Sequence, residues 1–449
     1  MGALAGAAGL SRVLPGCGSD GGVKGISTWV FMMMENRSYD HYFGARSLLE
    51  DKLGNGLVAG MSNLDTDGNA VAIWESTDET MCVVDPPHSW DRSRQQLNSG
   101  SCDGFVLAYQ QATGGTAAPM QYQTRRTLPV SWALADAYTS CDRWFCSLLG
   151  PTLPNRMYWH AGTSNGAKDN DTVIAGAFEG IPSIYHRLRD AGIEWAYYFG
   201  DAPVLGVLEQ ELTEGRIRRL WWDFFDDAAA GKLPPVVYID PAFARNDDHP
   251  PHHPGLGQQL ISAVYTALAT SPQWNNCNLL LTYDEHGGFF DHVAPPTAPD
   301  DRAAEGFDQL GFRVPALMIG PYARPGHVSS WDFDHTSALR HIETLFDLEP
   351  LSQRDATAID LTDLLDADRL ERGEPAPPIE LPAVDLVEDD LGPECSGSSF
   401  RTDGMRKWVA QIYDMVRQRE PDLVPADTRE QIYGIADYLD RHGRGRIRR

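Results

Sequence analysis

ISTWVFMMMENRSYDHYFG, residues 26–44, passes from a continuous apolar run directly into charged and polar side chains. An apolar run without alternation is typical of a parallel strand that is buried on both faces of its sheet. NLLLTYDEHGGFFDHVAPP, residues 278–296, has the same order of apolar and then polar residues. Together with three shorter runs, these segments predict buried strands at residues 26–34, 195–199, 236–239, 279–283 and 314–319.

Helical patterns separate the predicted strands. Apolar residues recur with helical spacing at residues 181–191, 256–270 and 336–346. Strands that alternate with helices indicate an α/β fold with a mainly parallel central sheet and helices on both faces. Ligands of such sheets bind beyond the carboxyl ends of the strands, so functional residues are expected there.

Changes in composition mark the expected domain boundaries. We expect an α/β domain at residues 23–371, preceded by a leader or export-signal remnant at residues 1–22. Residues 372–399 are rich in proline and acidic residues, which is typical of a linker or a long surface excursion. Residues 400–449 contain two amphipathic stretches, which predict helices packed on the main domain. These stretches span residues 404–417 and 428–440.

The chain of 449 residues is acidic, because 37 basic and 63 acidic side chains give a formal net charge of −26. Sequence-independent nucleic-acid binding relies on lysine and arginine at phosphates, so nucleic acid is excluded as a partner. No run reaches the roughly 18 apolar residues needed to cross a bilayer, so no transmembrane segment is expected. A phosphorylated ligand would need local cations, since the overall field repels it.

Two features favour an exported protein. Residues 14–17 resemble an imperfect lipoprotein cleavage box after a small, apolar start, although a plain flexible leader is the alternative. The six cysteines that follow Cys17 include no CxxC pair, which disfavours a zinc ribbon. They could form three disulfides, with Cys82–Cys102 as the simplest pairing. The alternative is that these thiols are buried and unpaired.

Two predicted strands end in groups of oxygen ligands. Glu35 and Asn36 follow the first strand, and Asp284 and Glu285 follow the fourth. Their oxygen atoms favour one hard divalent cation, Ca²⁺, Mg²⁺ or Mn²⁺, and leave zinc open. The alternative is that each carboxylate caps a following helix. Two such strand ends, each followed by histidine and aromatic residues, favour the metal site.

GPTLPNR, residues 150–156, supplies a candidate nucleophile. It reads as Thr-x-Pro-x-Arg, with Thr152 in the position that cysteine holds in the corresponding sulfatase motif. A threonine hydroxyl is a weak nucleophile unless a base or a metal lowers its pKa. Taken alone, the segment is also an ordinary proline-rich turn.

Histidines in proline-rich turns are candidate proton donors. His88 lies in PPHSW, residues 86–90, and His249 lies in DDHPPHH, residues 247–253. Imidazoles titrate near neutral pH, so they can protonate a leaving group or bind phosphoryl oxygens. The two histidines that follow in the second segment stay open, and residues 334–337 are interpreted as a helix start.

ENRSYDHYFG, GPTLPNR, DDHPP, TYDEHGGFFDHVAPP and DHTSALRHIETLF occur in this order between residues 26 and 346. Together they resemble the phosphoesterase family of bacterial phospholipases C and acid phosphatases, to which plant non-specific phospholipases C are similar. The resemblance implies an alkaline-phosphatase-like α/β sandwich. It also implies metal ligands at Glu35, Asn36, Asp284 and Glu285, a nucleophile at Thr152, and contacts of His88 and His249 with phosphate or leaving group.

The favoured function is metal-dependent hydrolysis of a phosphodiester, of the phospholipase C type, through a phosphothreonine intermediate. With one divalent ion the three carboxylates carry about −1, so compensating charge is expected from the histidines and from Arg37 or Arg156. The expected substrate is a phosphoester, in the first place a phospholipid. Four aromatic residues are candidates for lining its cleft, with core packing as the alternative. They are Trp90, Trp159, Phe289 and Phe290.

Two other functions stay open. One is a broad acid phosphatase that uses the same site on monoesters. The other is a non-catalytic cation- or lipid-binding surface protein built on an enzyme fold. A sulfatase is disfavoured, because oxidised threonine gives a ketone instead of the required aldehyde.

Overall fold

The central sheet organises the molecule. The structure is a computed structural model that describes residues 25–178, 180–208, 216–391, 395, 407–423 and 428–448, so the expected leader lies outside the described part. Within that part the sheet has eight strands in the order β12-β6-β11-β10-β1-β9-β7-β8. Their bounds in this order are Val328–Ser329, Thr139–Cys141, Ala316–Ile319, Cys277–Tyr283, Thr28–Met34, Val236–Asp240, Trp195–Phe199 and Ile217–Arg219.

The most buried strand, β1, lies between β10 and β9 and is parallel to both. All 7 residues of β1 are buried, which explains the continuous apolar run. Most pairs in the sheet are parallel, but β11 is antiparallel to β10 and to β6. The predicted strands are confirmed, and their ends differ from the observed ends by at most two residues.

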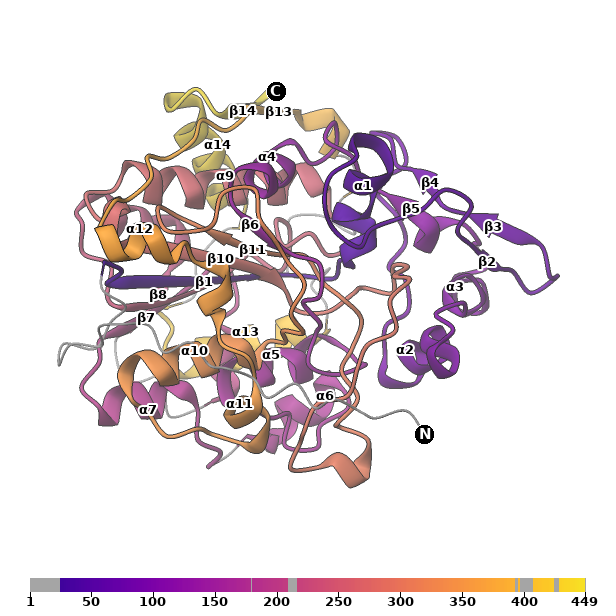
Figure 1. Cartoon of the computed structure of the whole chain (residues 1–449), viewed down its shortest axis with the longest axis horizontal. Coiled ribbons are helices and arrows are strands. Elements are labelled where there is room, and N and C mark those ends of the chain that lie inside the picture. The colour runs from indigo at the N-terminus through magenta and orange to yellow at the C-terminus, as the bar shows by residue number, and fades with distance from the viewer. Residues whose placement is uncertain are drawn as a thin grey trace.

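Helices cover both faces of the sheet, which confirms the α/β prediction (Figure 1). One face carries α4, Pro129–Ala137, α9, Pro254–Thr270, and α14, Thr428–Arg441. The helices on the other face are α5, Thr152–Ala161, α7, Ile184–Asp190, α10, Thr336–Phe346, α11, Gln353–Thr357, and α13, Lys407–Arg419. Among the described helices, none is long and apolar enough to span a membrane.

A smaller group of elements lies beyond the carboxyl end of β1 (Figure 1). It contains helices and two pairs of short strands, β2 with β3 and β4 with β5, all from the first third of the chain. The site therefore lies between the sheet and this group. Its elements are α1, Ala45–Glu50, β2, Ser62–Leu64, β3, Ala70–Ala72, β4, Trp74–Glu75, α2, Trp90–Leu97, α3, Phe105–Thr113, and β5, Gln121–Tyr122.

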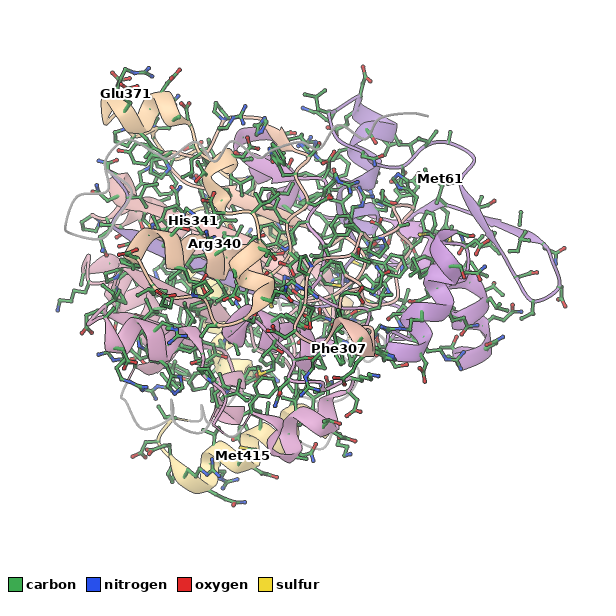
Figure 2. All side chains as sticks on the ribbon, turned by 60° about the horizontal axis from the view of Figure 1, so that its bottom comes forward. Met61, Phe307, Arg340, His341, Glu371 and Met415 are labelled. Atoms are coloured by element: carbon green, nitrogen blue, oxygen red, sulfur yellow. A yellow bond between two sulfur atoms is a disulfide. The ribbon has the colours of Figure 1, made fainter. Side chains whose placement is uncertain are left out.

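The C-terminal part packs on the sheet domain through both of its helices. Figure 2 shows Met415 on α13, well apart from His341 on α10. Ile412 and Val416 of α13 are buried, and a Cβ at Gly206 would touch both. Residues 372–391 include β13, Val384–Val387, which pairs in parallel with β14, Gly445–Arg448, next to α14.

The predicted Cys82–Cys102 disulfide is wrong, because Cys82 pairs with Cys395 at a Cα–Cα distance of 5.0 Å. Cys102 packs instead in an apolar cluster with Phe105 and Phe290. Closeness in sequence therefore did not identify the partner. In the described part of the chain the remaining cysteines are free and buried, so the expectation of three disulfides is also wrong. They are Cys102, Cys141, Cys146 and Cys277.

Candidate active site

The two predicted groups of oxygen ligands lie side by side, because β1 and β10 are neighbours in register. The backbone N–H of Asn36 donates to Asp284 Oδ1 at 3.0 Å, which joins the two strand ends directly. Asn36 has a left-handed backbone, with φ of 59°, that turns the chain sharply after β1. Gly287 allows the close approach, since a Cβ there would lie 2.2 Å from the Asn36 carbonyl oxygen.

Three buried acceptor atoms point to a bound cation. Asn36 Oδ1, Asp284 Oδ2 and Glu285 Oε1 are buried and have no hydrogen-bond partner within the described residues. An unsatisfied buried acceptor costs free energy, so such a group calls for a ligand. Amide and carboxylate oxygens of this kind fit a hard divalent ion. The other oxygens, Asp284 Oδ1 and Glu285 Oε2, accept backbone N–H groups.

Burial makes the carboxyl group of Asp284 hard to ionise. Burial, with the charge of Glu285 beside it, raises the pKa of Asp284 to about 7, although Arg156 acts in the opposite direction. Glu35, Asn36, Asp284 and Glu285 are all fully buried. A divalent ion would favour the ionised form of each carboxylate.

Helix α5 places Arg156 against the strand ends, and Thr152 lies one turn earlier on the same helix. Thr152 is its first residue and is buried, four residues before Arg156, so both side chains lie on the same face. The Arg156 guanidinium lies 2.8 Å from Asp240, 3.4 Å from Asp284 and 3.5 Å from Glu35. Arg156 contacts both strand ends, so the face of α5 that carries Thr152 and Arg156 is the face directed toward these strand ends.

His88 and His249 come from two different loops and meet through Asp85. Asp85 lies 3.6 Å from His88 Nδ1 and 3.8 Å from His249 Nε2. The ring centroids of the histidines are 5.9 Å apart. One ligand atom from each of these three residues lies within 4.8 Å of the others, so the group could itself hold a metal ion.

His88 also contacts the proposed ligands. Its Nε2 lies 3.3 Å from Asn36 Nδ2 and 3.6 Å from Glu285 Oε1, while its Nδ1–H donates to the Pro86 carbonyl at 2.7 Å. Burial alone would lower the pKa of His88, but the charges of Glu285 and Asp85 raise it to about 9. His88 is therefore suited to donate a proton near neutral pH.

Several other motif residues serve the architecture. Arg37 donates to the Asp248 carbonyl, and Arg313 joins Asp40 to Asp291 by ion pairs of 3.0 and 2.9 Å. Since Arg313 pairs with one carboxylate from each motif, it ties the first motif to the second.

The aromatic residues proposed for a lipid cleft are mostly in the core. Trp159, Phe289 and Phe290 are buried, and only Trp90 is partly exposed, packed on Phe307. Phe289 stacks on His41 with a centroid distance of 3.9 Å.

Sequence reasoning missed three residues that contact the site. Asp240 ends β9 and binds Arg156, Asp85 faces both histidines, and His335 Nε2–H donates to the Asp284 carbonyl at 2.7 Å. Asp240 follows a predicted strand directly, which was the available signal. Asp85 precedes the two prolines before His88, and His335 lies in the segment interpreted as a helix start. That segment does open α10, with Asp334 accepting from Thr336 N–H at 3.0 Å.

Comparisons with known proteins agree with this architecture. Residues 26–349 match the Phosphoesterase family. Non-specific phospholipase C6 of Arabidopsis thaliana is 33% identical over 377 residues, which cover 76% of this chain and 72% of that protein. Phospholipase C B of Mycobacterium tuberculosis (strain ATCC 25618 / H37Rv) is 31% identical over 408 residues, which cover 76% and 78%.

Solved structures share parts of the arrangement at low scores. The phosphonate monoester hydrolase of Agrobacterium radiobacter is 10% identical, with a TM-score of 0.37 over 76% of this chain and 77% of that one. A protein in the alkaline phosphatase superfamily from Vibrio parahaemolyticus is 10% identical, with a TM-score of 0.35 over 67% and 71%. The sequence matches, which span most of the chain, carry the assignment. The protein is a phosphoric ester hydrolase and belongs to the phosphoesterase family.

Proposed function

We propose that this protein is a phospholipase C, which hydrolyses a phosphodiester and in the first place a phospholipid. The observation that carries the proposal is the group of buried acceptor atoms on Asn36, Asp284 and Glu285 that accept no hydrogen bond within the described chain, although Arg156 and His88 lie 3.4 and 3.6 Å from the two carboxylate oxygens. Relatives that are named phospholipase C, at 31–34% identity, support the same reaction class.

One divalent cation is proposed to bind at the two strand ends. Glu35, Asn36, Asp284 and Glu285 would hold it through oxygen atoms, and the absence of thiolates from this set favours Ca²⁺, Mg²⁺ or Mn²⁺. When bound, the ion supplies positive charge for a phosphoryl group and lowers the pKa of a nearby hydroxyl.

The protein's own residues then carry two displacements. Thr152 Oγ, which has first lost its proton to solvent, forms a bond to phosphorus while the bond from phosphorus to the alcohol oxygen breaks, and His249 or His88 gives that oxygen a proton. Water next attacks the phosphothreonine, the bond from phosphorus to Thr152 breaks, and the histidine takes a proton from the water. One side chain therefore serves as acid and then as base.

The charges of the described site favour a diester. The carboxylates of Glu35, Asp240 and Asp284 pair with one guanidinium, that of Arg156, and Glu285 adds a fourth carboxylate beside Asp284. With one divalent ion the sum is about −1, which repels a phosphate dianion more than a diester monoanion.

Trapping of the intermediate tests the proposal. The enzyme is loaded with the divalent ion, mixed with para-nitrophenyl phosphorylcholine, quenched in acid and digested. We expect mass spectrometry to find phosphocholine on Thr152, because the nitrophenol leaves and the choline ester stays, and we expect a choline phospholipid to be cleaved faster than para-nitrophenyl phosphate at neutral pH. Faster cleavage of the monoester at every pH would favour an acid phosphatase. No chelator-sensitive hydrolysis of any phosphoester would refute catalysis and favour a binding protein.

We also propose that the protein is exported. The Cys82–Cys395 disulfide supports this proposal, because disulfides persist mainly in oxidising compartments. Fractionation of cells that express the full chain tests it, and recovery of the protein only from the cytosol would refute it.

A further inference from the structure

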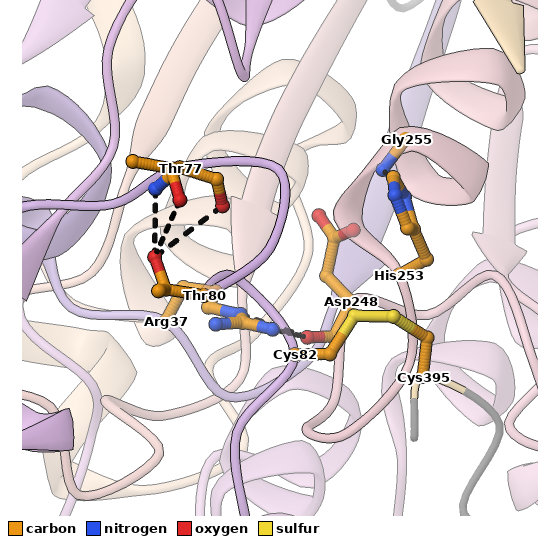
Figure 3. Close-up of a disulfide and its surroundings, with 8 residues drawn as sticks. All are labelled: Arg37, Thr77, Thr80, Cys82, Asp248, His253, Gly255 and Cys395. Carbon is orange, nitrogen blue, oxygen red and sulfur yellow. Dashed lines mark hydrogen bonds between the residues drawn. A yellow bond between two sulfur atoms is a disulfide. The ribbon is translucent and has the colours of Figure 1, made fainter. Parts of the chain in front are cut away.

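The Cys82–Cys395 disulfide lies in the loop that brings Asp85 and His88 to the site. Residues 76–89 connect β4 to α2 without helix or strand. Figure 3 draws Asp248 and His253, the residues that flank the His249 turn, among the surroundings of the disulfide. The disulfide therefore lies near both the loop that carries His88 and the turn that carries His249.

Both ends of this loop are held by hydrogen bonds. At its start, Thr77 and Thr80 form a closed turn with bonds of 2.8 and 3.0 Å. At its end, Gln96 of α2 donates to the Pro87 carbonyl at 2.7 Å, and Ser93 donates to the His88 carbonyl at 3.2 Å. His88 is thus anchored to α2 independently of the disulfide.

The middle of the loop lacks such support. The backbone of Val83 and Val84 makes no hydrogen bond to any other described residue, and the Val84 side chain is 64% exposed. Asp85 follows directly and is itself about two-fifths exposed, with a side-chain value of 41%. The disulfide at Cys82 is therefore the nearest covalent restraint on the position of Asp85.

The other end of the disulfide leads to a firmly packed segment. Leu391, four residues before Cys395, packs with Leu256 of α9 and Ile432 of α14. The Val384 carbonyl accepts from Gln259 of α9 at 2.9 Å. The described segment that ends four residues before Cys395 therefore packs on α9, the helix that begins five residues after His249.

We propose that the Cys82–Cys395 disulfide is a positioning cross-link that holds Asp85 between the imidazoles of His88 and His249. The inference rests on the proposed function, in which these histidines act on the phosphoryl group and the leaving oxygen. Asp85 contacts a different ring on each side, so a displaced loop loses both contacts together. The disulfide thereby acts on catalysis through Asp85.

A double-mutant cycle tests this coupling. Cys82→Ser/Cys395→Ser is expected to lower kcat about tenfold with little change in KM, since misplacement of a catalytic group by about 1 Å can cost up to roughly a hundredfold. Asp85→Asn should cause a similar loss. The combined variant should lose little more kcat than either change alone, because both changes remove the same contacts. In the control background Asp78→Asn, an exposed position of the same loop, disulfide removal should keep its full effect.

Reduction of the wild-type protein covers the case in which the serine variant does not fold. A phosphine reductant converts the disulfide to two thiols, and diiodomethane then joins them as S–CH₂–S with loss of two HI. Activity should fall on reduction, return after bridging, and stay low after capping with N-ethylmaleimide. The inference is overturned if reduced and capped enzyme keeps the wild-type kcat, or if the losses from disulfide removal and Asp85→Asn multiply. Full activity of Thr152→Ala would instead overturn the proposed function, and the cycle would still report on the cross-link.

Discussion

Replacement of Arg156 by methionine tests whether a cation binds at the two strand ends. The guanidinium is fully buried and lies 2.8 Å from Asp240, 3.4 Å from Asp284 and 3.5 Å from Glu35. Removal of one partner from a buried ion pair leaves uncompensated charge. We therefore expect the free energy of unfolding, measured with a chelator present, to fall by about 3–5 kcal/mol.

A divalent cation should restore part of this loss. A ligand that binds only the folded state adds about 2.7 kcal/mol to stability at a hundred times its dissociation constant. Arg156 repels a cation held by Glu35 and Asp284, so the variant should bind the ion more tightly than the wild type. The stability difference between the two proteins should then shrink by about 1–3 kcal/mol when the ion replaces the chelator.

Arg354→Met is the matched control for urea unfolding with chelator or with Mn²⁺. Arg354 is also buried and pairs with Asp300 at 3.0 Å and Asp334 at 3.1 Å, away from the proposed ligands. Its replacement should be destabilising to a similar degree, with no dependence on the ion. The cation does not bind beside Arg156 if it leaves the difference in unfolding free energy between Arg156→Met and wild type unchanged. The same conclusion follows if it reduces the difference between Arg354→Met and wild type by an equal amount.

Three other changes have defined outcomes. Thr152→Ala should lower kcat by about three orders of magnitude or more while Thr152→Ser keeps measurable turnover, and near-normal activity of the alanine variant would exclude the nucleophile. Because burial raises the pKa of Asp284 to about 7, protons compete with the cation at acid pH. Calorimetric titration should show affinity falling by about tenfold per pH unit below 7, whereas a flat profile would contradict this. Burial, together with Asp355, raises the pKa of Glu343 to about 9, so ionisation of the unfolded chain removes stability as pH rises from 4.5 towards 9. Glu343→Gln should therefore gain up to about 1.4 kcal/mol per pH unit relative to wild type over this range, and a constant difference in unfolding free energy would refute the assignment.

The sequence predicted those strands whose burial is reflected in their amino-acid composition. β1 and β10 are buried on both faces, so every position is apolar or small, and their ends are visible where charge begins. β6 lies inside the sheet but reads Thr-Ser-Cys, and its polar side chains bond within the core, as Thr139 Oγ does to the Arg324 carbonyl. β8 and β12 are short edge strands with little apolar content. Neither type gives a periodic signal.

The direction of a strand also could not be predicted from its sequence. β11 has the same kind of apolar run as β10, yet the two are antiparallel. Burial on both faces decides the composition of a strand, and it does so for either direction. Direction depends on how the connecting chain returns to the sheet, which local composition does not encode.

The sequence indicated candidate ligands where a strand end carries adjacent oxygen-bearing side chains, and it gave no signal where two distant loops meet. Glu35 and Asp284 are visible because each follows a buried run. The disulfide joins residues separated by 313 positions, and Asp85 reaches His249 across 164 positions (249 − 85). Such contacts depend on the packing of whole loops against the sheet, which no local spacing reports.

The two arginines named as counterions for phosphate both have other partners. Arg37 is fully buried and donates to the Asp248 carbonyl, and Arg156 is enclosed by carboxylates. Their charges therefore stabilise the protein scaffold of the site. Burial lowers the pKa of His286, and that of His335 to about 4, so among the described residues of the proposed site His88 and His249 are the candidate cations.

These histidines then have two tasks, to balance the charge of the substrate and to protonate the leaving oxygen. The site already carries about −1 before substrate binds. To balance the substrate itself, a diester monoanion needs one added positive charge, whereas a dianionic monoester needs two. With a dianion, both imidazoles would be held as cations by the substrate, and transfer of a proton from either would remove charge that the bound phosphate requires. With a diester, one imidazole can stay protonated while the other gives up its proton. The scarcity of free positive charge is thus the physical reason that we favour a phosphodiester as the natural substrate.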